Sequence, residues 1–315
     1  MDGQPDDTDT APNAAAPPAA GWSEPLIVAG GGRMGEALVK GLLAAGWRPD
    51  RIAVVEVSQH RRFELEQAGY TSRGVLVVPF VGDAVEGLAA GSAQAHATGA
   101  ELSVSHGSGP GPLGAVLAVK PHDAGPACAE LYQAGVRRVL SIAAGVTLRT
   151  LEAWLESVAV LRSMPNTAAT VGAAASAFCR GRSAGDDDAA WAAGILGAVG
   201  TVIEVPERSL DAVTGLSGSG PAYVFLVVEA LIDAGVHVGL PRDVAKTLAV
   251  ATVAGSAKLL QVTGEEASAL RANVTSPGGT TAAGLRQLER GAVRAAILDA
   301  VVASTERAGE LGTQT

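Results

Sequence analysis

Apolar residues along this chain come first as short runs separated by glycines, and later as long helical stretches. Runs such as 25–29 and 52–56 are too short for a stable helix and are typical of buried parallel strands. Similar runs predict further strands at 75–78, 115–119, 138–143, 158–161, 173–179 and 200–205, with helices at 36–45, 58–68 and 82–90. Strands that alternate with helices predict a doubly wound α/β sheet.

The pattern changes after Pro206, where long segments rich in Ala, Leu and Val predict helices at 222–234, 242–260, 281–290 and 293–309. Helices that are apolar over much of their surface need burial, and little chain remains here to supply it. We therefore predict that this half of the chain dimerises. The stretch 222–232 carries Glu229 and is followed by Asp233, so we interpret it as a buried helix and predict no membrane span.

The first predicted strand leads into Gly30-x-Gly32-x-x-Gly35, which opens the first helix. Glycines at this spacing are informative only in the strand–turn–helix context that they occupy here. Gly30 makes the tight turn, Gly32 lets a pyrophosphate approach the backbone, and Gly35 allows the helix to pack closely. Arg33 and Met34 lie in the same turn. This pattern predicts a Rossmann-like site for a nicotinamide dinucleotide.

The residues after the second strand leave the form of that dinucleotide open. Glu56 stands 21 positions after Gly35, where an acidic residue binds the ribose 2′-hydroxyl of NAD. Ser58, Arg61 and Arg62 follow closely, and arginines are suited to a 2′-phosphate. The alternative for Arg61 and Arg62 is a solvated helix face.

Composition narrows the function. The chain has 315 residues, enough for about two domains, with a net charge of −9 and 3% aromatic residues. An acidic chain without aromatic platforms is not expected to bind nucleic acid. The two cysteines are far apart and the five histidines form no close pair, so we predict no protein-bound metal. No signal peptide is apparent, and we expect a cytoplasmic protein.

The segment Ser276-Pro277-Gly278-Gly279-Thr280-Thr281 predicts a tight turn that feeds directly into an amphipathic helix. Pro277 fixes one backbone angle, and the two glycines permit angles closed to other residues. Backbone amides at a helix start favour an anion such as a carboxylate, and two hydroxyls stand beside them. The segment is therefore a candidate site for a small carboxylate. The alternative is a Ser-Pro helix start whose glycines serve only packing.

Three regions follow from these patterns. Residues 1–22 are rich in Asp, Ala and Pro and predict a disordered acidic tail. Residues 23–206 predict the dinucleotide-binding domain, in which the Gly-, Ala-, Ser- and Pro-rich stretch 91–113 is expected to be a flexible insertion. Residues 207–315 predict a helical dimerisation and substrate domain.

The chain contains three more motifs: Ala118-Val-Lys-Pro121, Arg162-Ser-Met-Pro-Asn166 and Leu216-Ser-Gly-Ser-Gly-Pro-Ala-Tyr223. Together with residues 270–289, they form a set of motifs that resembles one known family. With them, residues 24–310 resemble the pyrroline-5-carboxylate reductase family. The resemblance implies a Rossmann domain followed by an all-α dimerisation domain of the 6-phosphogluconate-dehydrogenase type. It implies hydride transfer from NADPH, the preferred donor, or NADH to the C=N carbon of 1-pyrroline-5-carboxylate, which yields L-proline. It also implies a homodimer, with a larger ring of dimers as a further assembly.

The resemblance also implies roles for individual residues. Thr281 matches the catalytic threonine whose hydroxyl contacts the ring nitrogen, and Ser276, Gly278, Gly279 and Thr280 match the loop that holds the substrate carboxylate. Glu207 matches a glutamate of the substrate pocket. The remaining cofactor-side matches are Ala118, Lys120, Pro121, Asn166 and Asn273.

Some of these residues have alternative roles. Lys120 is the right type for a catalytic acid, although the family assigns that strand end a backbone role. Asn166 is suited to an Asx turn, residues 218–221 to the start of a helix, and the Glu229/Asp233 pair to a polar stripe. The chain departs from the family in its acidic tail, in the 91–112 stretch, at Glu56, and at Ala168, where many members have Pro.

Three other functions compete with this interpretation. A 3-hydroxyacid or 6-phosphogluconate-type dehydrogenase needs a catalytic lysine on a helix after the sheet, and neither Lys246 nor Lys258 lies in such a motif. A non-catalytic dinucleotide-binding regulator would not need the intact 276–281 segment. An oligomeric scaffold would leave both glycine loops without a purpose.

Overall fold

A computed structural model describes residues 24–97 and 112–313 of the chain. The predicted tail at 1–22 lies outside the described residues. The chain divides into two compact units. One runs to Gly218 and includes the end of the last helix from Glu306, and the other runs from Ser219 to Thr305.

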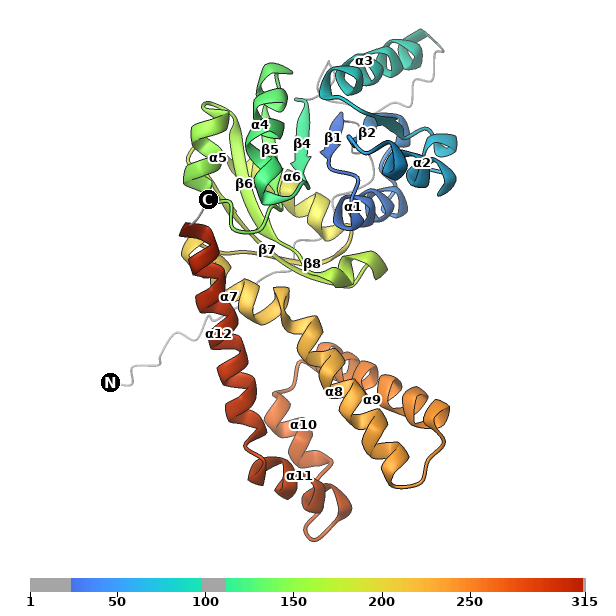
Figure 1. The fold of residues 1–315 in the computed structure, drawn as a ribbon, viewed down its shortest axis with the longest axis vertical. Coiled ribbons are helices and arrows are strands. Elements are labelled where there is room, and N and C mark those ends of the chain that lie inside the picture. The colour runs from blue at the N-terminus through green and yellow to red at the C-terminus, as the bar shows by residue number, and fades with distance from the viewer. Residues whose placement is uncertain (1–23, 98–111, 314–315) are drawn as a thin grey trace, which may run out of the picture. The chain divides into compact units, whose positions relative to one another are not determined.

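The first unit is built on one eight-stranded sheet in the order β3-β2-β1-β4-β5-β6-β7-β8 (Figure 1). All neighbouring strands are parallel except β6 and β7. The first six positions have the strand order of a Rossmann fold, as the sequence predicts. The strands are β1 Leu26–Ala29, β2 Ile52–Val55, β3 Leu76–Val78, β4 Gly114–Leu117, β5 Arg138–Ser141, β6 Ala159–Met164, β7 Ala174–Arg180 and β8 Gly200–Glu204.

Helices cover both faces of this sheet, which explains why its central strands are continuously apolar. Leu26 and Val28 face one core, and Ile27 and Ala29 face the other. The first core includes α1 (Arg33–Ala44), α2 (Gln59–Gln67) and α6 (Asp186–Gly197). The second includes α3 (Val81–Ala97), α4 (Ala124–Gln133) and α5 (Leu148–Leu155). The sequence patterns did not predict α4, α5 or α6.

The prediction of an extended loop over 91–113 is partly wrong. Helix α3 continues through Gly91 to Ala97, and residues 98–111 lie outside the described residues. Alanine is the strongest helix former, and the alanines of 89–97 outweigh the cost of Gly91. Only the remainder of the proposed insertion stays a prediction.

The boundary between the compact units lies twelve residues beyond the predicted change at 206/207. Helix α7 (Leu210–Val213) and the π-helical turn Thr214–Gly218 still belong to the sheet unit. Leu210 is 1% exposed and packs in the second core. A hydrogen bond from Asn166 to the Ser217 carbonyl also ties the turn to this unit.

The second unit is entirely helical. It contains α8 (Gly220–His237), α9 (Arg242–Thr263), α10 (Ala267–Asn273), α11 (Thr280–Arg290) and the greater part of α12 (Val293–Thr313). Of these, α10 was not predicted. Helices α8 and α9 pack on each other, and Gly235 meets Ala245 where they do so.

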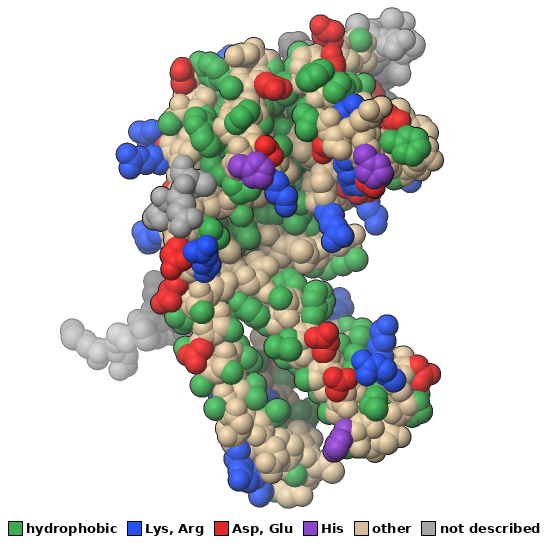
Figure 2. All heavy atoms as spheres, viewed as in Figure 1, with side chains coloured by type: hydrophobic (Ala, Val, Ile, Leu, Met, Phe, Trp, Pro, Cys, Tyr) green, Lys and Arg blue, Asp and Glu red, His purple; other side chains and the backbone are tan. Residues whose placement is uncertain are grey.

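The expectation that residues 222–232 form a buried helix is wrong for the single chain. Helix α8 has no buried residue, and Phe225 is 63% exposed. Hydrophobic side chains are visible at the surface of the helical unit (Figure 2). One helical run of the described residues, Glu207–His237, is long and apolar enough to cross a membrane by length and composition, and 11% of its most apolar window is buried. The same composition is typical of a helix that a partner subunit covers.

Candidate active site

The turn after β1 has the three properties that a dinucleotide-binding glycine loop requires. Gly30 adopts a φ of +106°, and a Cβ there would stand 2.6 Å from the Ala118 carbonyl oxygen. A Cβ on Gly35 would overlap the Gly30 carbonyl oxygen, so α1 packs directly on the turn. By contrast, a Cβ on Gly32 would meet nothing within 4 Å. The loop is therefore closed at its two ends and open at the position where a pyrophosphate would approach.

The N-terminus of α1 adds a favourable field for a phosphate. Gly32 is the residue that precedes the helix, and no side chain of the described residues caps it there. The first-turn amides therefore have no acceptor within the helix and carry partial positive charge. Arg33 is exposed in this first turn, whereas Met34 packs partly against the core. A negatively charged pyrophosphate fits this end of the helix.

The strand order reverses at this loop, because β1 pairs with β2 on one side and with β4 on the other. The Ala118 amide donates to the Ala29 carbonyl at 2.7 Å, which places the end of β4 beside the glycine turn. Lys120 and Pro121 follow, with the Lys120 side chain exposed. Ligands of open α/β sheets bind at such a switch point. The predicted cofactor residues Gly30, Ala118 and Pro121 therefore share one edge of the sheet.

Glu56 lies on the β2 side of the switch point, and its carboxylate contacts the glycine loop. One oxygen accepts the Gly31 amide at 3.0 Å and the other accepts the Ser58 amide at 2.9 Å. The Ser58 hydroxyl in turn caps α2 by accepting the Arg61 amide at 3.3 Å. The predicted ribose-binding carboxylate is thus held at the mouth of the loop.

The guanidinium of Arg61 is held by three groups. Its Nε donates to the Gly31 carbonyl at 2.7 Å, and its terminal nitrogens contact Glu64 at 2.8 Å and Glu36. Hydrogen bonding to Glu64 is the largest cause that raises the pKa of Arg61. Arg62 donates to the carbonyls of Glu56 and Val57 at 2.7 and 2.9 Å. Both arginines are therefore engaged within the protein, which the sequence did not indicate.

Two exposed apolar side chains beside this edge were missed by the sequence analysis. Val57 directly follows β2, and Phe80 lies two residues after β3; both are exposed. The Glu56 amide donates to the Val78 carbonyl at 3.0 Å, so the two strand ends are adjacent. In the sequence, the available signal was an aromatic residue, Phe80, two positions after the predicted strand 75–78.

Asn166 lies at the end of β6 with both ends of its amide engaged. Its nitrogen donates to the Ser217 carbonyl at 3.0 Å, and its oxygen accepts the Ala175 amide at 3.3 Å. The side chain is 8% exposed. It therefore joins β6, β7 and the π-helical turn, and its predicted contact with cofactor stays a prediction.

Glu207 is also engaged within the sheet unit. One carboxylate oxygen accepts the Leu148 amide at 2.7 Å and contacts the Arg162 guanidinium at 2.9 Å. These contacts link the start of α5 to β6. The Arg162 guanidinium balances the negative charge of Glu207 without a substrate. The predicted place of Glu207 in the substrate pocket stays a prediction.

A small pocket of about 40 Å³ lies at the ends of β5 and β6, on the side of the switch point away from Glu56. Ala143, Ala144 and Ser163 contribute to its lining. The Ser163 hydroxyl is buried and has no hydrogen-bond partner among the described residues. The sequence analysis includes this serine in the motif 162–166 but gives it no role of its own, because it lies beyond the predicted end of the strand at 161.

The second predicted loop, 276–281, belongs to the helical unit. Gly278 adopts a φ of +71°, and the Gly279 amide donates back to the Ser276 carbonyl at 3.0 Å. Helix α11 then begins at Thr280, and within the described residues no side chain caps its first turn. Thr280, Thr281 and Ser276 are exposed, as is Asn273 at the end of α10. The turn therefore presents backbone amides and hydroxyls together, as a carboxylate site requires.

The cysteines show no sign of a catalytic role. Burial is the main cause that raises the pKa of Cys128 and of Cys179 to about 12, so neither thiol is ionised near neutrality. Among the described residues, no group of three or more His, Cys, Asp or Glu side chains is arranged to hold a metal ion.

The fold and the glycine loop define a dinucleotide-dependent oxidoreductase, and comparisons with known proteins narrow the class. Residues 207–311 match the family model for pyrroline-5-carboxylate reductase dimerisation. The chain is 40% identical over 312 residues to the pyrroline-5-carboxylate reductase of Mycobacterium tuberculosis, covering 91% of this chain and 96% of the relative. It is 39% identical over 285 residues to the enzyme of that name from Arabidopsis thaliana, covering 90% and 93%.

Solved structures agree. A pyrroline-5-carboxylate reductase from Coxiella burnetii superposes with a TM-score of 0.76 at 33% identity, covering 92% of this chain and 98% of the other. A Plasmodium falciparum pyrroline carboxylate reductase with NADP bound gives a TM-score of 0.72 at 27% identity, covering 92% and 98%. The chain belongs to the NAD(P)H-dependent pyrroline-5-carboxylate reductase family, which confirms the resemblance noted in the sequence.

Proposed function

We propose that this chain reduces 1-pyrroline-5-carboxylate to L-proline, the last step of proline biosynthesis. The observation that carries the proposal is the loop Ser276–Thr281, which presents first-turn amides and two threonine hydroxyls in a chain of this family. A cyclic imine with a carboxylate beside its ring nitrogen offers a partner to each of those groups.

The residues of the loop divide the binding between them. Ser276, Gly278, Gly279 and Thr280 hold the substrate carboxylate against the amides at the start of α11. The Thr281 hydroxyl hydrogen-bonds the ring nitrogen and orients the imine. Both contacts of Glu207 use one carboxylate oxygen, so its other oxygen is the atom that a role in the substrate pocket would use. Positioning of this kind supplies much of the rate when two reactants must meet in one geometry.

On the cofactor side, the chain supplies position and electrostatics. The glycine loop and α1 take the pyrophosphate, with Arg33 and Met34 in the same turn, and Val57 and Phe80 cover the adenine half. The family resemblance assigns Ala118, Lys120, Pro121, Asn166 and Asn273 to the nicotinamide half. When bound, the reduced nicotinamide supplies the hydride that the imine carbon accepts, while the ring nitrogen keeps its proton. A protonated imine is a good hydride acceptor, so no strongly shifted acid is required.

The hydride donor of this proposal is NADPH or NADH. The sequence ranks NADPH first, because Arg61 and Arg62 stand where a 2′-phosphate would be bound. The preference between the two donors depends on whether those arginines bind a 2′-phosphate or Glu56 binds a 2′-hydroxyl. The reaction itself is the same with either donor.

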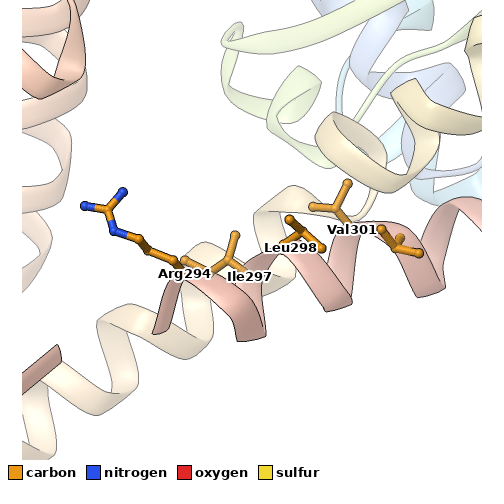
Figure 3. Close-up of a pocket in the computed structure, with 5 residues that line it drawn as sticks. Arg294, Ile297, Leu298 and Val301 are labelled. Atoms are coloured by element: carbon orange, nitrogen blue, oxygen red, sulfur yellow. The ribbon is translucent and has the colours of Figure 1, made fainter. Parts of the chain in front are cut away.

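The apolar surface of the helical unit supports a homodimer as the working form. Arg294, Ile297, Leu298, Val301 and Val302 form a stripe along α12 at helical spacing, and they line a shallow groove (Figure 3). Together with exposed α8, this is more apolar surface than a soluble single chain leaves uncovered. We propose a homodimer in the cytoplasm, and a ring of dimers as its larger assembly.

Turnover with the proposed substrate tests this function. Purified protein should oxidise NADPH or NADH only when 1-pyrroline-5-carboxylate is present, and should form one L-proline for each dinucleotide oxidised. Binding of dinucleotide without turnover would instead support a regulator. Turnover of 3-hydroxyacids would support the dehydrogenase alternative, in which the exposed lysines of α9, Lys246 and Lys258, would become the residues to test.

A further inference from the structure

The carboxylate of Glu56 lies where a bound dinucleotide would place its ribose. The two nicotinamide dinucleotides differ at that ribose. In a Rossmann fold, the end of β2 faces the ribose that carries a 2′-hydroxyl in NADH and a 2′-phosphate in NADPH. Glu56 directly follows β2, and its two oxygens are fixed by the amides of Gly31 and Ser58. The charge therefore lies at a defined place beside the glycine loop.

Binding a 2′-phosphate here would require an arginine to compensate for that charge. Arg61 is 24% exposed, and its guanidinium is already divided between the Gly31 carbonyl and two carboxylates, those of Glu36 and Glu64. Its donation to Gly31 also holds the loop, so releasing it would cost more than a surface ion pair.

Arg62 is tied to the backbone at the end of β2. Its guanidinium donates to the carbonyls of Glu56 and Val57, which closes the end of β2. The carboxylates of Glu36, Glu56 and Glu64 outnumber these two arginines. A phosphate monoester with a charge near −2 would lie beside the fixed carboxylate of Glu56, whereas a hydroxyl can donate to that carboxylate in a charge-assisted hydrogen bond.

We propose that Glu56 is the residue that selects NADH over NADPH, by accepting the ribose 2′-hydroxyl while Glu36 and Glu64 keep Arg61 from a 2′-phosphate. This inference rests on the proposed function only in naming the reaction that the selected cofactor serves. It reverses the ranking that the sequence gives, because that ranking treats Arg61 and Arg62 as available.

The test measures binding and turnover separately. Dissociation constants for NADH and NADPH come from titrations of cofactor fluorescence, and kcat/KM for each comes from reduction of 1-pyrroline-5-carboxylate. The variants are Glu56→Gln, which keeps an acceptor for Gly31 but removes the charge, and Glu36→Gln, which removes one contact of Arg61. Glu66→Gln is the matched control, since Glu66 is an exposed carboxylate of α2 that forms no ion pair among the described residues.

The wild-type protein should bind NADH at least about tenfold more tightly than NADPH, the worth of one hydrogen bond to a charged group. Glu56→Gln should lose about that factor for NADH and gain affinity for NADPH. Glu36→Gln should improve NADPH alone, and Glu66→Gln should leave the ratio unchanged.

A wild-type preference for NADPH would overturn the proposal, and so would a Glu56→Gln variant with an unchanged affinity ratio. A changed ratio in binding with no turnover by either cofactor would support the role of Glu56 and contradict the proposed reaction. Turnover by variants whose ratio of NADH to NADPH affinity is unchanged would support the proposed reaction and contradict the role of Glu56.

Discussion

The Cα of Gly35 faces the carbonyl oxygen of Gly30 so closely that even a methyl group would overlap it. Gly32, between them, has open space at the same position. One loop thus contains a glycine required by packing and a glycine left free for a ligand.

These two glycines should respond differently to the same substitution. Gly35→Ala forces α1 away from the turn and should lower the free energy of unfolding by about 2 kcal/mol or more, because the contact is with backbone. Gly32→Ala should leave the melting temperature nearly unchanged and weaken binding of both dinucleotides. Thermal unfolding and fluorescence titration of the two variants check this; a destabilised Gly32→Ala variant would argue against an open position.

Replacement of Thr281 tests the hydroxyl of the second loop. Thr281 is exposed in the first turn of α11, so Thr281→Ala should leave the fold intact. We expect kcat to fall by about 100-fold or more, a typical effect of removing a group that positions the reacting centre. Thr281→Ser should restore much of the activity, because it keeps the hydroxyl. Equal rates for wild type and Thr281→Ala would remove this residue from the site.

The buried thiols predict a loss of stability in alkali. The pKa of Cys128 and of Cys179 is raised from 9.0 to about 12, chiefly by burial. A raised pKa means that the folded state keeps its proton longer, so this stabilisation is complete below pH 9 and is lost between pH 9 and about 12. Each thiol should cost about 1.4 kcal/mol of unfolding free energy per pH unit in that window.

Denaturant titrations at pH 8, 9 and 10 measure that loss. The double variant Cys128→Ala, Cys179→Ala is the control, since it cannot ionise at these positions. Its stability should fall less steeply with pH than that of the wild type. Parallel curves for the two proteins would show that the thiols do not contribute.

A charge on the apolar face of α12 should break the proposed dimer. Leu298 is 62% exposed in the single chain, and a buried unpaired carboxylate at a subunit interface is strongly unfavourable. Leu298→Glu should therefore shift the protein to monomers in size-exclusion chromatography with light scattering. Val171→Glu is the control, because Val171 is 78% exposed on the sheet unit. Dimers of unchanged affinity in Leu298→Glu would place the interface elsewhere.

The sequence predicts most of the sheet, because its central strands are short, apolar and bounded by glycines. It fails for α4 and α6, whose apolar residues are spread among Ala and Gly and give a weak helical period. It also fails for α5, which is only eight residues long although Leu148, Leu151 and Leu155 lie at helical spacing. It also ends β6 three residues early, since Arg162 and Ser163 look polar but are buried in the strand. The buried guanidinium of Arg162 contacts Glu207, 45 residues away, which local patterns do not register.

The candidate site was predictable where a motif fixes backbone geometry. The conformations of Gly30 and Gly278 follow from their patterns. The sequence did not predict which side chains contact each other. Arg61 is predicted to face a phosphate but contacts Glu36, 25 residues earlier. Asn166 donates to the carbonyl of Ser217, 51 residues later. Contacts at such separation are set by the packing of the sheet, so only the structure shows which charges are already in use.

The most direct test of the central claim follows the transferred hydrogen. Reduced dinucleotide that carries deuterium at the transferable position of the nicotinamide is mixed with the protein and 1-pyrroline-5-carboxylate, and the product is analysed by mass spectrometry. The account predicts L-proline with one deuterium, on the carbon that was the imine carbon. Unlabelled proline, or oxidation of the dinucleotide without proline, would contradict it.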